Sequence, residues 1–168
     1  MKLKSSENVT WIWSDLHLGH KKLYTSEIDI PERKRFKDSD EADKYMLEAY
    51  LEHVRPGDKV YFLGDVFFGN SGYETLKKMN TGNNYLVMGN HDRYHSKKFS
   101  IVFNKIYGVK YLEKAILTHV PIHPRELEFR RNINIHGHTH GEKINDERYI
   151  NVCVEQTNFK PITLESIL

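Results

Sequence analysis

Short apolar runs, rich in β-branched and aromatic residues, recur along the chain, and most of them end in Asp, Asn or His, in some cases beside a glycine. Runs of this kind are typical of buried strands. They cover residues 9–15, 59–65, 84–90, 114–119, 133–137 and 149–154. The sequence therefore predicts a series of strands, several of which are followed by a polar side chain and a tight turn.

Helical periodicity appears between these strands. Residues 40–54 place apolar side chains at steps of three and four, which predicts an amphipathic helix, and Asp38 with Glu41 forms an N-terminal capping pattern before it. We expect a shorter helix over residues 73–79 and a last turn over residues 163–168. Strands that alternate with helices indicate an α/β architecture around one core.

The stretch between residues 21 and 37 shows no clear period. It is basic and contains Pro31, so we expect an exposed loop there.

Length and composition describe a soluble globular chain. The 168 residues suit a single domain over residues 1–168, and 25 Lys and Arg against 23 Asp and Glu leave a net charge of only +2. This charge disfavours nucleic-acid binding as the sole function. Cys153 is the only cysteine, which excludes a disulfide framework and any multi-cysteine metal site. Since no apolar run approaches the length of a membrane span, we expect a cytoplasmic protein without a membrane partner.

Polar residues at the strand ends are the candidates for chemistry. In open α/β sheets, ligands bind beyond the carboxyl ends of the strands, so side chains far apart in sequence converge there. Asp15 and His17 are two residues apart and would project to the same side of an extended backbone, as would His138 and His140.

Together with three further strand-end residues, these side chains form a set of metal ligands. The set contains two Asp, one Asn and four His: Asp15, His17, Asp65, Asn90, His119, His138 and His140. Seven ligands are too many for one tetrahedral ion but suit two ions that share a carboxylate. The mixture of oxygen and nitrogen favours Mn²⁺, Fe, Zn²⁺, Co²⁺ or Ni²⁺ over Ca²⁺ and Mg²⁺. His119 is the least determined member, because His123 lies close by, and its place at a predicted strand end favours it.

In order and spacing, these residues resemble the five motifs of the calcineurin-like metallophosphoesterase family. The motifs are Asp15-Leu-His17, Gly64-Asp65, Gly89-Asn90-His91-Asp92, His119 and Gly137-His138-Thr-His140. They span about three quarters of the chain. The resemblance implies a four-layer α/β/β/α sandwich of two mixed sheets flanked by helices, with the metal site at the carboxyl ends of the strands.

The resemblance also implies a role for each motif residue. One divalent ion, with Mn²⁺ the first choice, would be held by Asp15, His17 and His140, and the other by Asn90, His119 and His138. Asp65 would bridge the two ions, and a hydroxide between them would be the nucleophile. His91 would protonate the leaving oxygen, and Asp92 would orient His91. Two cations lower the pKa of a bound water and stabilise the attacking and leaving oxygens at phosphorus.

The sequence departs from the family pattern at Phe68. Many members carry a second acidic residue three places after the motif aspartate, here Asp65. The departure leaves the metal set complete and puts in question the outer support of the site and the subfamily. His20, Arg93 and His123 are candidates for binding the substrate phosphate. The alternative interpretation is that they are ordinary surface charges.

The favoured function is a phosphodiesterase, because an alkoxide leaving group benefits most from a general acid such as His91. A phosphomonoesterase acting on a small phosphorylated substrate is the alternative. A non-catalytic metal-binding scaffold is disfavoured, because the ligand set is complete. The short chain predicts an open site that would take a nucleotide, a cyclic nucleotide or a nucleic-acid end.

Overall fold

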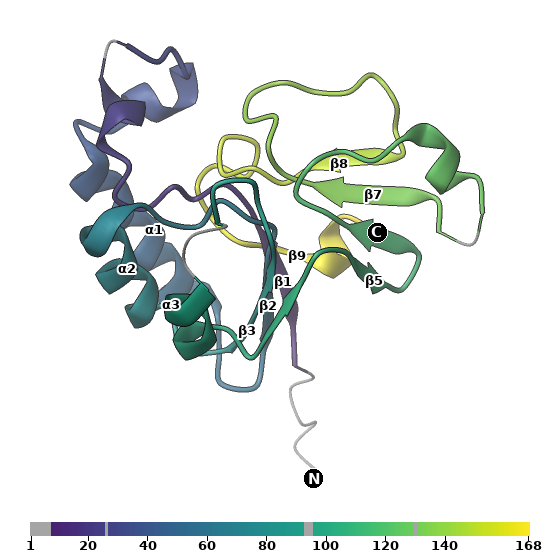
Figure 1. The fold of residues 1–168 in the computed structure, drawn as a ribbon, viewed down its shortest axis with the longest axis horizontal. Coiled ribbons are helices and arrows are strands. Elements are labelled where there is room, and N and C mark those ends of the chain that lie inside the picture. Colours follow the sequence, from purple (N-terminus) through teal and green to yellow (C-terminus); the bar gives the residue numbers. More distant parts are fainter. Residues whose placement is uncertain (1–7, 26, 93–95, 130) are drawn as a thin grey trace, which may run out of the picture.

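Two mixed sheets and three α-helices make up the computed structural model, which describes residues 8–25, 27–92, 96–129 and 131–168 (Figure 1). The first sheet has the strand order β4-β3-β2-β1-β9. Its strands are β1 (Thr10–Trp13), β2 (Lys59–Phe62), β3 (Asn83–Val87), β4 (Lys105–Tyr107) and β9 (Ile162–Thr163). The first four run parallel, and β9 pairs antiparallel with β1.

The second sheet has the order β5-β6-β7-β8. Its strands are β5 (Lys110–Leu112), β6 (Ala115–Leu117), β7 (Ile133–His136) and β8 (Tyr149–Asn151). The last three are parallel, and β5 runs antiparallel to β6. The predicted architecture of two mixed sheets flanked by helices is confirmed.

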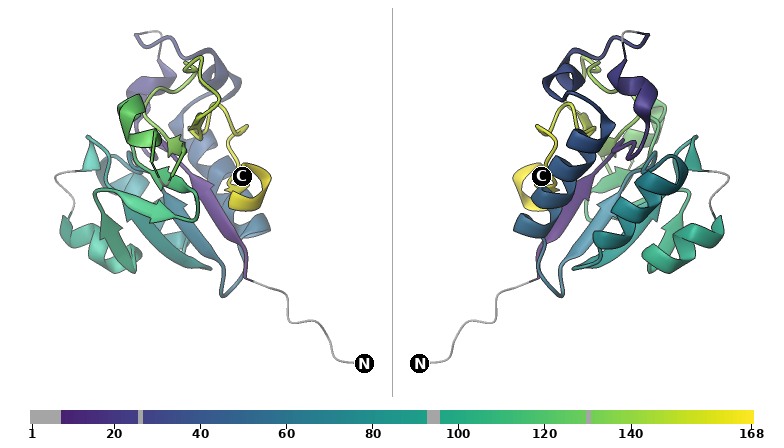
Figure 2. Two further views of the ribbon diagram at one scale, coloured as in Figure 1. Left: turned by 90° about the vertical axis from the view of Figure 1, so that its right-hand side faces the viewer. Right: turned by 90° about the vertical axis from the view of Figure 1, so that its left-hand side faces the viewer.

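The α-helices cover one face of the first sheet, and the second sheet lies on the other side (Figures 1 and 2). They are α1 (Ser39–His53), α2 (Gly69–Lys78) and α3 (Ser96–Val102). Four 3-10 helices complete the described elements: η1 (Lys21–Tyr24), η2 (Pro31–Arg35), η4 (Pro124–Leu127) and η5 (Leu164–Ser166). None of the helices in the described ranges is long and apolar enough to span a bilayer.

Side-chain alternation in the first sheet divides the core in two. On β2, Phe62 packs into the cluster beneath the helices, whereas Tyr61 belongs to the cluster between the sheets. Trp13 and Ile12 alternate in the same way on β1. Successive side chains of a strand point to opposite faces, so this sheet is apolar on both.

Helix α1 begins as the capping pattern predicts. Oδ1 of Asp38 accepts a hydrogen bond of 3.0 Å from the amide of Glu41, and the Glu41 carboxylate accepts one of 2.6 Å from the amide of Lys37. Helix α2 begins earlier than expected, at Gly69. Close packing favours glycine in its first turn, since a Cβ at Gly72 would lie 2.0 Å from the carbonyl oxygen of Leu18.

The expectation of an exposed loop over residues 21–37 is correct only in part, although most of the described residues there are exposed. The stretch contains η1 and η2, and Arg33 on η2 is completely buried.

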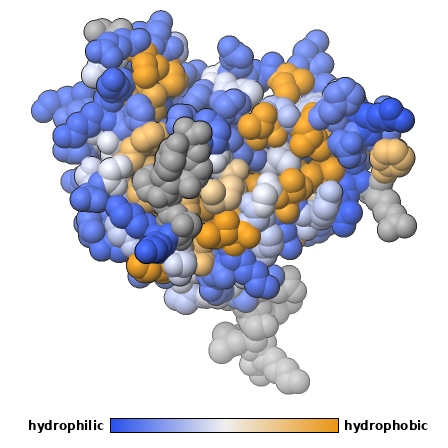
Figure 3. Space-filling view, in the orientation of Figure 1, coloured by the Kyte–Doolittle hydropathy of each residue, from blue (hydrophilic) through white to orange (hydrophobic). Residues whose placement is uncertain are grey.

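The edge strands β4 and β5 carry exposed apolar side chains, Ile106 and Tyr111, and Val109 lies exposed between them. Figure 3 shows hydrophobic residues gathered in the middle and right of this face of the molecule, with hydrophilic residues around them. Both edge strands have three residues, too few to show a period in the sequence.

Candidate metal centre

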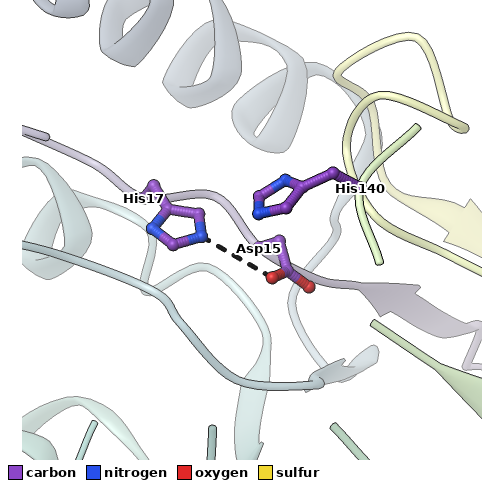
Figure 4. Close-up of side chains that lie close together, drawn as sticks. All are labelled: Asp15, His17 and His140. Carbon is purple, nitrogen blue, oxygen red and sulfur yellow. Dashed lines mark ion pairs between the residues drawn. The ribbon is translucent and has the colours of Figure 1, made fainter. Parts of the chain in front are cut away.

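The loops that follow the parallel strands bring two groups of ligands together. Group 1 consists of Asp15, His17 and His140, which each offer one ligand atom within 4.8 Å of the others. Figure 4 shows the two imidazoles of group 1 around the Asp15 carboxylate. The other ligands, Asp65, His119 and His138, meet the same limit. Oδ1 of Asn90 lies 2.9 Å from Nε2 of His119, so group 2 consists of Asp65, Asn90, His119 and His138.

Asp65 belongs to group 2 but also faces group 1. Its Oδ2 is 3.4 Å from Nε2 of His119 in group 2 and 3.8 Å from Nε2 of His17 in group 1. One carboxylate oxygen therefore faces both groups, as a bridging ligand must.

The hydrogen bonds of Asp15 separate its two carboxylate oxygens by role. Oδ2 accepts from the Ser14 hydroxyl at 2.6 Å, from the His138 amide at 2.8 Å and from the Cys153 thiol at 3.3 Å. Among the described residues, Oδ1 has no hydrogen-bond partner although it is buried, and the same holds for Nε2 of His17, which lies 3.6 Å away. Buried polar atoms without partners are costly, and a cation bound to this oxygen and this nitrogen would satisfy both. The residues present therefore fit a divalent metal ion.

Burial and charge set the protonation of these ligands. Burial alone would raise the pKa of Asp15, but the neighbouring imidazole of His17 and the charge of His119 hold it well below its usual range. Burial lowers the pKa of His17 to about 4. At neutral pH, Asp15 is thus an ionised carboxylate and His17 a neutral imidazole, the forms that bind metal.

His119 is held in its protonated form in the metal-free chain. Burial lowers its pKa, but the hydrogen bond to Asp65 and the charge of Asp15 raise it further, to about 9. A metal ion at group 2 would therefore take the place of a proton.

Five of these ligands have left-handed backbone conformations. The φ angles of Asp15, His17, Asp65, His138 and His140 lie between 47° and 70°. The expectation of an extended backbone at Asp15–His17 and at His138–His140 is therefore wrong, although each pair does face one site. Non-glycine residues in this region cost of the order of 1–3 kcal/mol each and concentrate at functional sites.

Two motif glycines allow the ligand loops to approach one another. A Cβ at Gly137 would lie 2.2 Å from Oδ2 of Asp15, and one at Gly89 would lie 2.2 Å from Oδ1 of Asp65. Any side chain at either position would displace a carboxylate, which explains the glycine beside the metal-binding residues.

His91 lies at the mouth of the site. Its side chain is 50% exposed, and Nε2 is 3.9 Å from Oδ2 of Asp65. The placement leaves the imidazole accessible from solvent and close to both groups.

Asp92 has other partners than the sequence led us to expect. Its carboxylate accepts hydrogen bonds from the amides of Asp65 and Gly89 at 2.9 and 2.8 Å, and from that of Val66 at 3.3 Å. No hydrogen bond among the described residues joins it to the His91 ring. The carboxylate is turned inward to hold the loops after β2 and β3 together, so it fixes the main chain around Asp65 instead of orienting His91.

Phe68 is packed among histidines. Its ring stacks on His17 at 5.3 Å, meets the edge of His20 at 4.1 Å and contacts His91 at 5.3 Å. The aromatic ring thus supports three imidazoles by contact at the position where many family members have an acid.

Of the candidates for substrate phosphate within the described residues, His20 lies against the metal centre, since its ring also contacts His17 at 5.8 Å. Its Nδ1 is buried without a partner among the described residues. His123 is exposed, and its Nδ1 accepts from the amide of Arg125 within its own turn. Within the described residues, no hydrogen bond or ion pair joins it to either group. Arg93 lies outside the described residues.

The sequence motifs do not point to two further functional candidates, Arg33 and Glu155. The Glu155 carboxylate lies 3.0 Å from Nδ1 of His140 and 2.6 Å from Nε of Arg33. Neither residue belongs to a motif, and the only signal was an acidic residue following the last predicted strand.

Two hollows flank the centre. One, of about 560 Å³, adjoins His138 and His140 and has acidic walls formed by Asp29, Glu32 and Glu142. The other, of about 470 Å³, adjoins Asn90 and His119, and its walls are mainly apolar: Met88, Val109, Val120, Pro121 and Ile122.

Comparison with known proteins agrees with this geometry. The sequence profile of the calcineurin-like phosphoesterases matches residues 9–152. The chain belongs to the calcineurin-like phosphoesterase family. Members are dinuclear metal-dependent phosphoesterases, so this protein is a hydrolase whose substrate is a phosphate ester. Its two His/Asp metal-binding groups are Asp15 with His17 and His140, and Asp65 with His119 and His138.

Similar proteins come from several organisms. An uncharacterized protein of Methanocaldococcus jannaschii is 31% identical over 169 residues, which cover 94% of this chain and 88% of that protein. The gene 66 protein of Mycobacterium phage L5 is 33% identical over 90 residues, which cover 51% of this chain and 41% of the phage protein. The crystal structure of a protein of unknown function from Aquifex aeolicus superposes with a TM-score of 0.73 at 25% identity, covering 96% of this chain and 98% of the other.

Proposed function

We propose that this phosphoesterase hydrolyses phosphodiesters, with Mn²⁺ the preferred metal and Fe, Zn²⁺, Ni²⁺ and Co²⁺ as alternatives. Asp15, His17 and His140 would hold one ion, Asn90, His119 and His138 the other, and Asp65 both. The observation that carries the proposal is His91, a half-exposed imidazole whose Nε2 is 3.9 Å from Oδ2 of Asp65.

The bound ions would supply an activated water and neutralise the charge that develops on the phosphoryl oxygens. The chain supplies the proton. A diester releases an alkoxide, which is a poor leaving group at neutral pH, so a proton donor at the mouth of the site accelerates its departure. The main-chain hydrogen bond from His91 to Asp65 holds this donor beside the reacting phosphate.

The surroundings of the site suit a diester with an organic substituent. The apolar hollow beside Asn90 and His119 would accept a base or another uncharged group. The acidic walls beside His138 and His140 would repel further phosphates on that side. A cyclic nucleotide satisfies both conditions, as does the end of a nucleic acid whose chain runs away from the acidic walls.

The test is a comparison of two chromogenic esters after removal of metal and reconstitution with Mn²⁺. Bis-p-nitrophenyl phosphate and p-nitrophenyl phosphate release the same phenolate, so their ratio reports the class of ester. Asp65→Asn, prepared identically, controls for contaminating phosphatase. We expect metal-dependent turnover of the diester; turnover of the monoester alone would identify a phosphatase, and two bound ions without hydrolysis of either would favour a scaffold.

A further inference from the structure

A buried ion pair lies directly behind group 1. Arg33 on η2 and Glu155 after β8 are separated by 122 residues, and Nε of Arg33 is 2.6 Å from Oε1 of Glu155. Both side chains are fully shielded from solvent. Buried charges require close pairing and hydrogen bonds, so this pair is a fixed element of the structure.

The carboxylate of the pair contacts a metal ligand. Oε1 of Glu155 lies 3.0 Å from Nδ1 of His140. With this oxygen as acceptor, the imidazole carries its proton on Nδ1 and keeps a free lone pair on Nε2. Figure 4 shows one ring nitrogen of His140 turned toward Asp15 and His17, and the other turned away from them.

The guanidinium of the pair holds the other side of group 1. Nη2 of Arg33 donates to the carbonyl oxygen of Asp15 at 2.7 Å, and Nη1 donates to that of Leu16 at 3.4 Å. Nη1 also donates to the Tyr24 hydroxyl at 2.9 Å. Arg33 therefore fixes the left-handed turn that presents Asp15 and His17, while its partner fixes His140.

We propose that Arg33 and Glu155 are positioning residues that set the metal affinity of group 1 and leave that of group 2 unchanged. The inference rests on the metal centre of the proposed function. Asp15 and His140 are each hydrogen-bonded to one member of this pair. His17 follows Leu16, whose carbonyl oxygen accepts from Arg33. No hydrogen bond or ion pair in the described part of the chain joins Arg33 or Glu155 to group 2.

The competing explanation is that the pair only attaches η2 to the core. That explanation predicts a loss of thermal stability with metal binding intact. Ours predicts a loss of metal affinity confined to one of the two sites.

Calorimetric titration of metal-free protein with Mn²⁺ separates these explanations. Glu155→Gln retains the volume and an oxygen acceptor but removes the charge, and Arg33→Lys retains the charge but loses the forked donor. We expect two binding events in the wild type and, in each variant, an affinity for one ion that is about 10–100-fold weaker, the usual effect of altering groups that orient metal ligands. The affinity for the other ion should stay within about twofold of its wild-type value.

Electron paramagnetic resonance supplies an independent readout. At two equivalents of Mn²⁺, the wild type should give the spectrum of a coupled pair, and the variants that of an isolated ion. Asp146→Asn, which removes the partly exposed pair with Arg148, is the control and should behave as the wild type.

Three results would overturn the inference. They are unchanged affinities despite a lower apoprotein Tm, an equal loss at both sites, and a wild type that binds no Mn²⁺ at group 1. Since the titration uses no substrate, a protein that binds both ions but hydrolyses no diester would refute the proposed function and leave this inference standing.

Discussion

The amide of His91 donates a 2.9 Å hydrogen bond to Oδ1 of Asp65. This bond occupies one carboxylate oxygen and leaves Oδ2 facing His17 and His119. The residue that we propose as proton donor is thus joined by its own main chain to the carboxylate that would bridge the ions. Changes at these two positions should have separable effects.

Asp65→Asn should abolish hydrolysis and reduce the bound metal from two ions to one or none. The variant amide oxygen would still accept from His91, which turns the NH₂ group toward His17 and His119. A donor then stands where a bridging anion is needed, while the fold is retained. Elemental analysis after dialysis checks the metal content, and near-wild-type turnover would refute the bridging role.

His91→Gln should keep both ions, because the main-chain bond to Asp65 does not depend on the side chain. Turnover of a dinucleoside monophosphate should fall by about 10²–10⁴-fold, the usual contribution of a general acid. The loss on bis-p-nitrophenyl phosphate should be much smaller, because p-nitrophenolate leaves without protonation. Equal losses on both substrates, or a loss of metal, would show that His91 has a different role.

Asp92→Ala should destabilise the metal-free protein by roughly 2–4 kcal/mol, because the amides of Asp65, Val66 and Gly89 lose their acceptor. Urea denaturation measures this change. The pH profile of turnover per bound metal pair should match that of the wild type. A shifted pH profile of turnover, with an unchanged free energy of unfolding, would instead support a direct effect of Asp92 on His91.

Metal affinity at group 2 should rise with pH up to about 9, the pKa to which Asp65 and Asp15 raise His119 against the opposing effect of burial. Below that pH, His119 must lose a proton before it can bind a cation, so each pH unit should change the affinity up to about tenfold. Calorimetry in buffers of different ionisation enthalpy should detect the released proton. A pH-independent affinity between 6 and 8, without proton release, would contradict the assignment of His119.

Local signals made much of the metal centre predictable. Most motifs combine an apolar run, a polar residue and a glycine within a few positions, as Gly64 and Asp65 do after the run that precedes them. The convergence of these loops follows from the parallel strands.

The support behind the ligands was not predictable. Arg33 lies in a basic stretch without periodicity, and its partner Glu155 is 122 residues away, so composition suggested a solvated charge. The role of Asp92 was equally inaccessible, because main-chain amides leave no trace in a sequence. Strands of two or three residues, such as β9, depend on tertiary pairing for their existence.

Four of the five left-handed ligands occur in two pairs, each with one residue between its members: Asp15 with His17, and His138 with His140. Because glycine would relax the backbone at each of these positions, the demands of folding and of chemistry are opposed there. A lineage released from selection for hydrolysis would gain stability by exchanging these ligands for glycine or asparagine. Its strands would survive that drift, and the torsion angles of the empty loops would still mark where the metals had been.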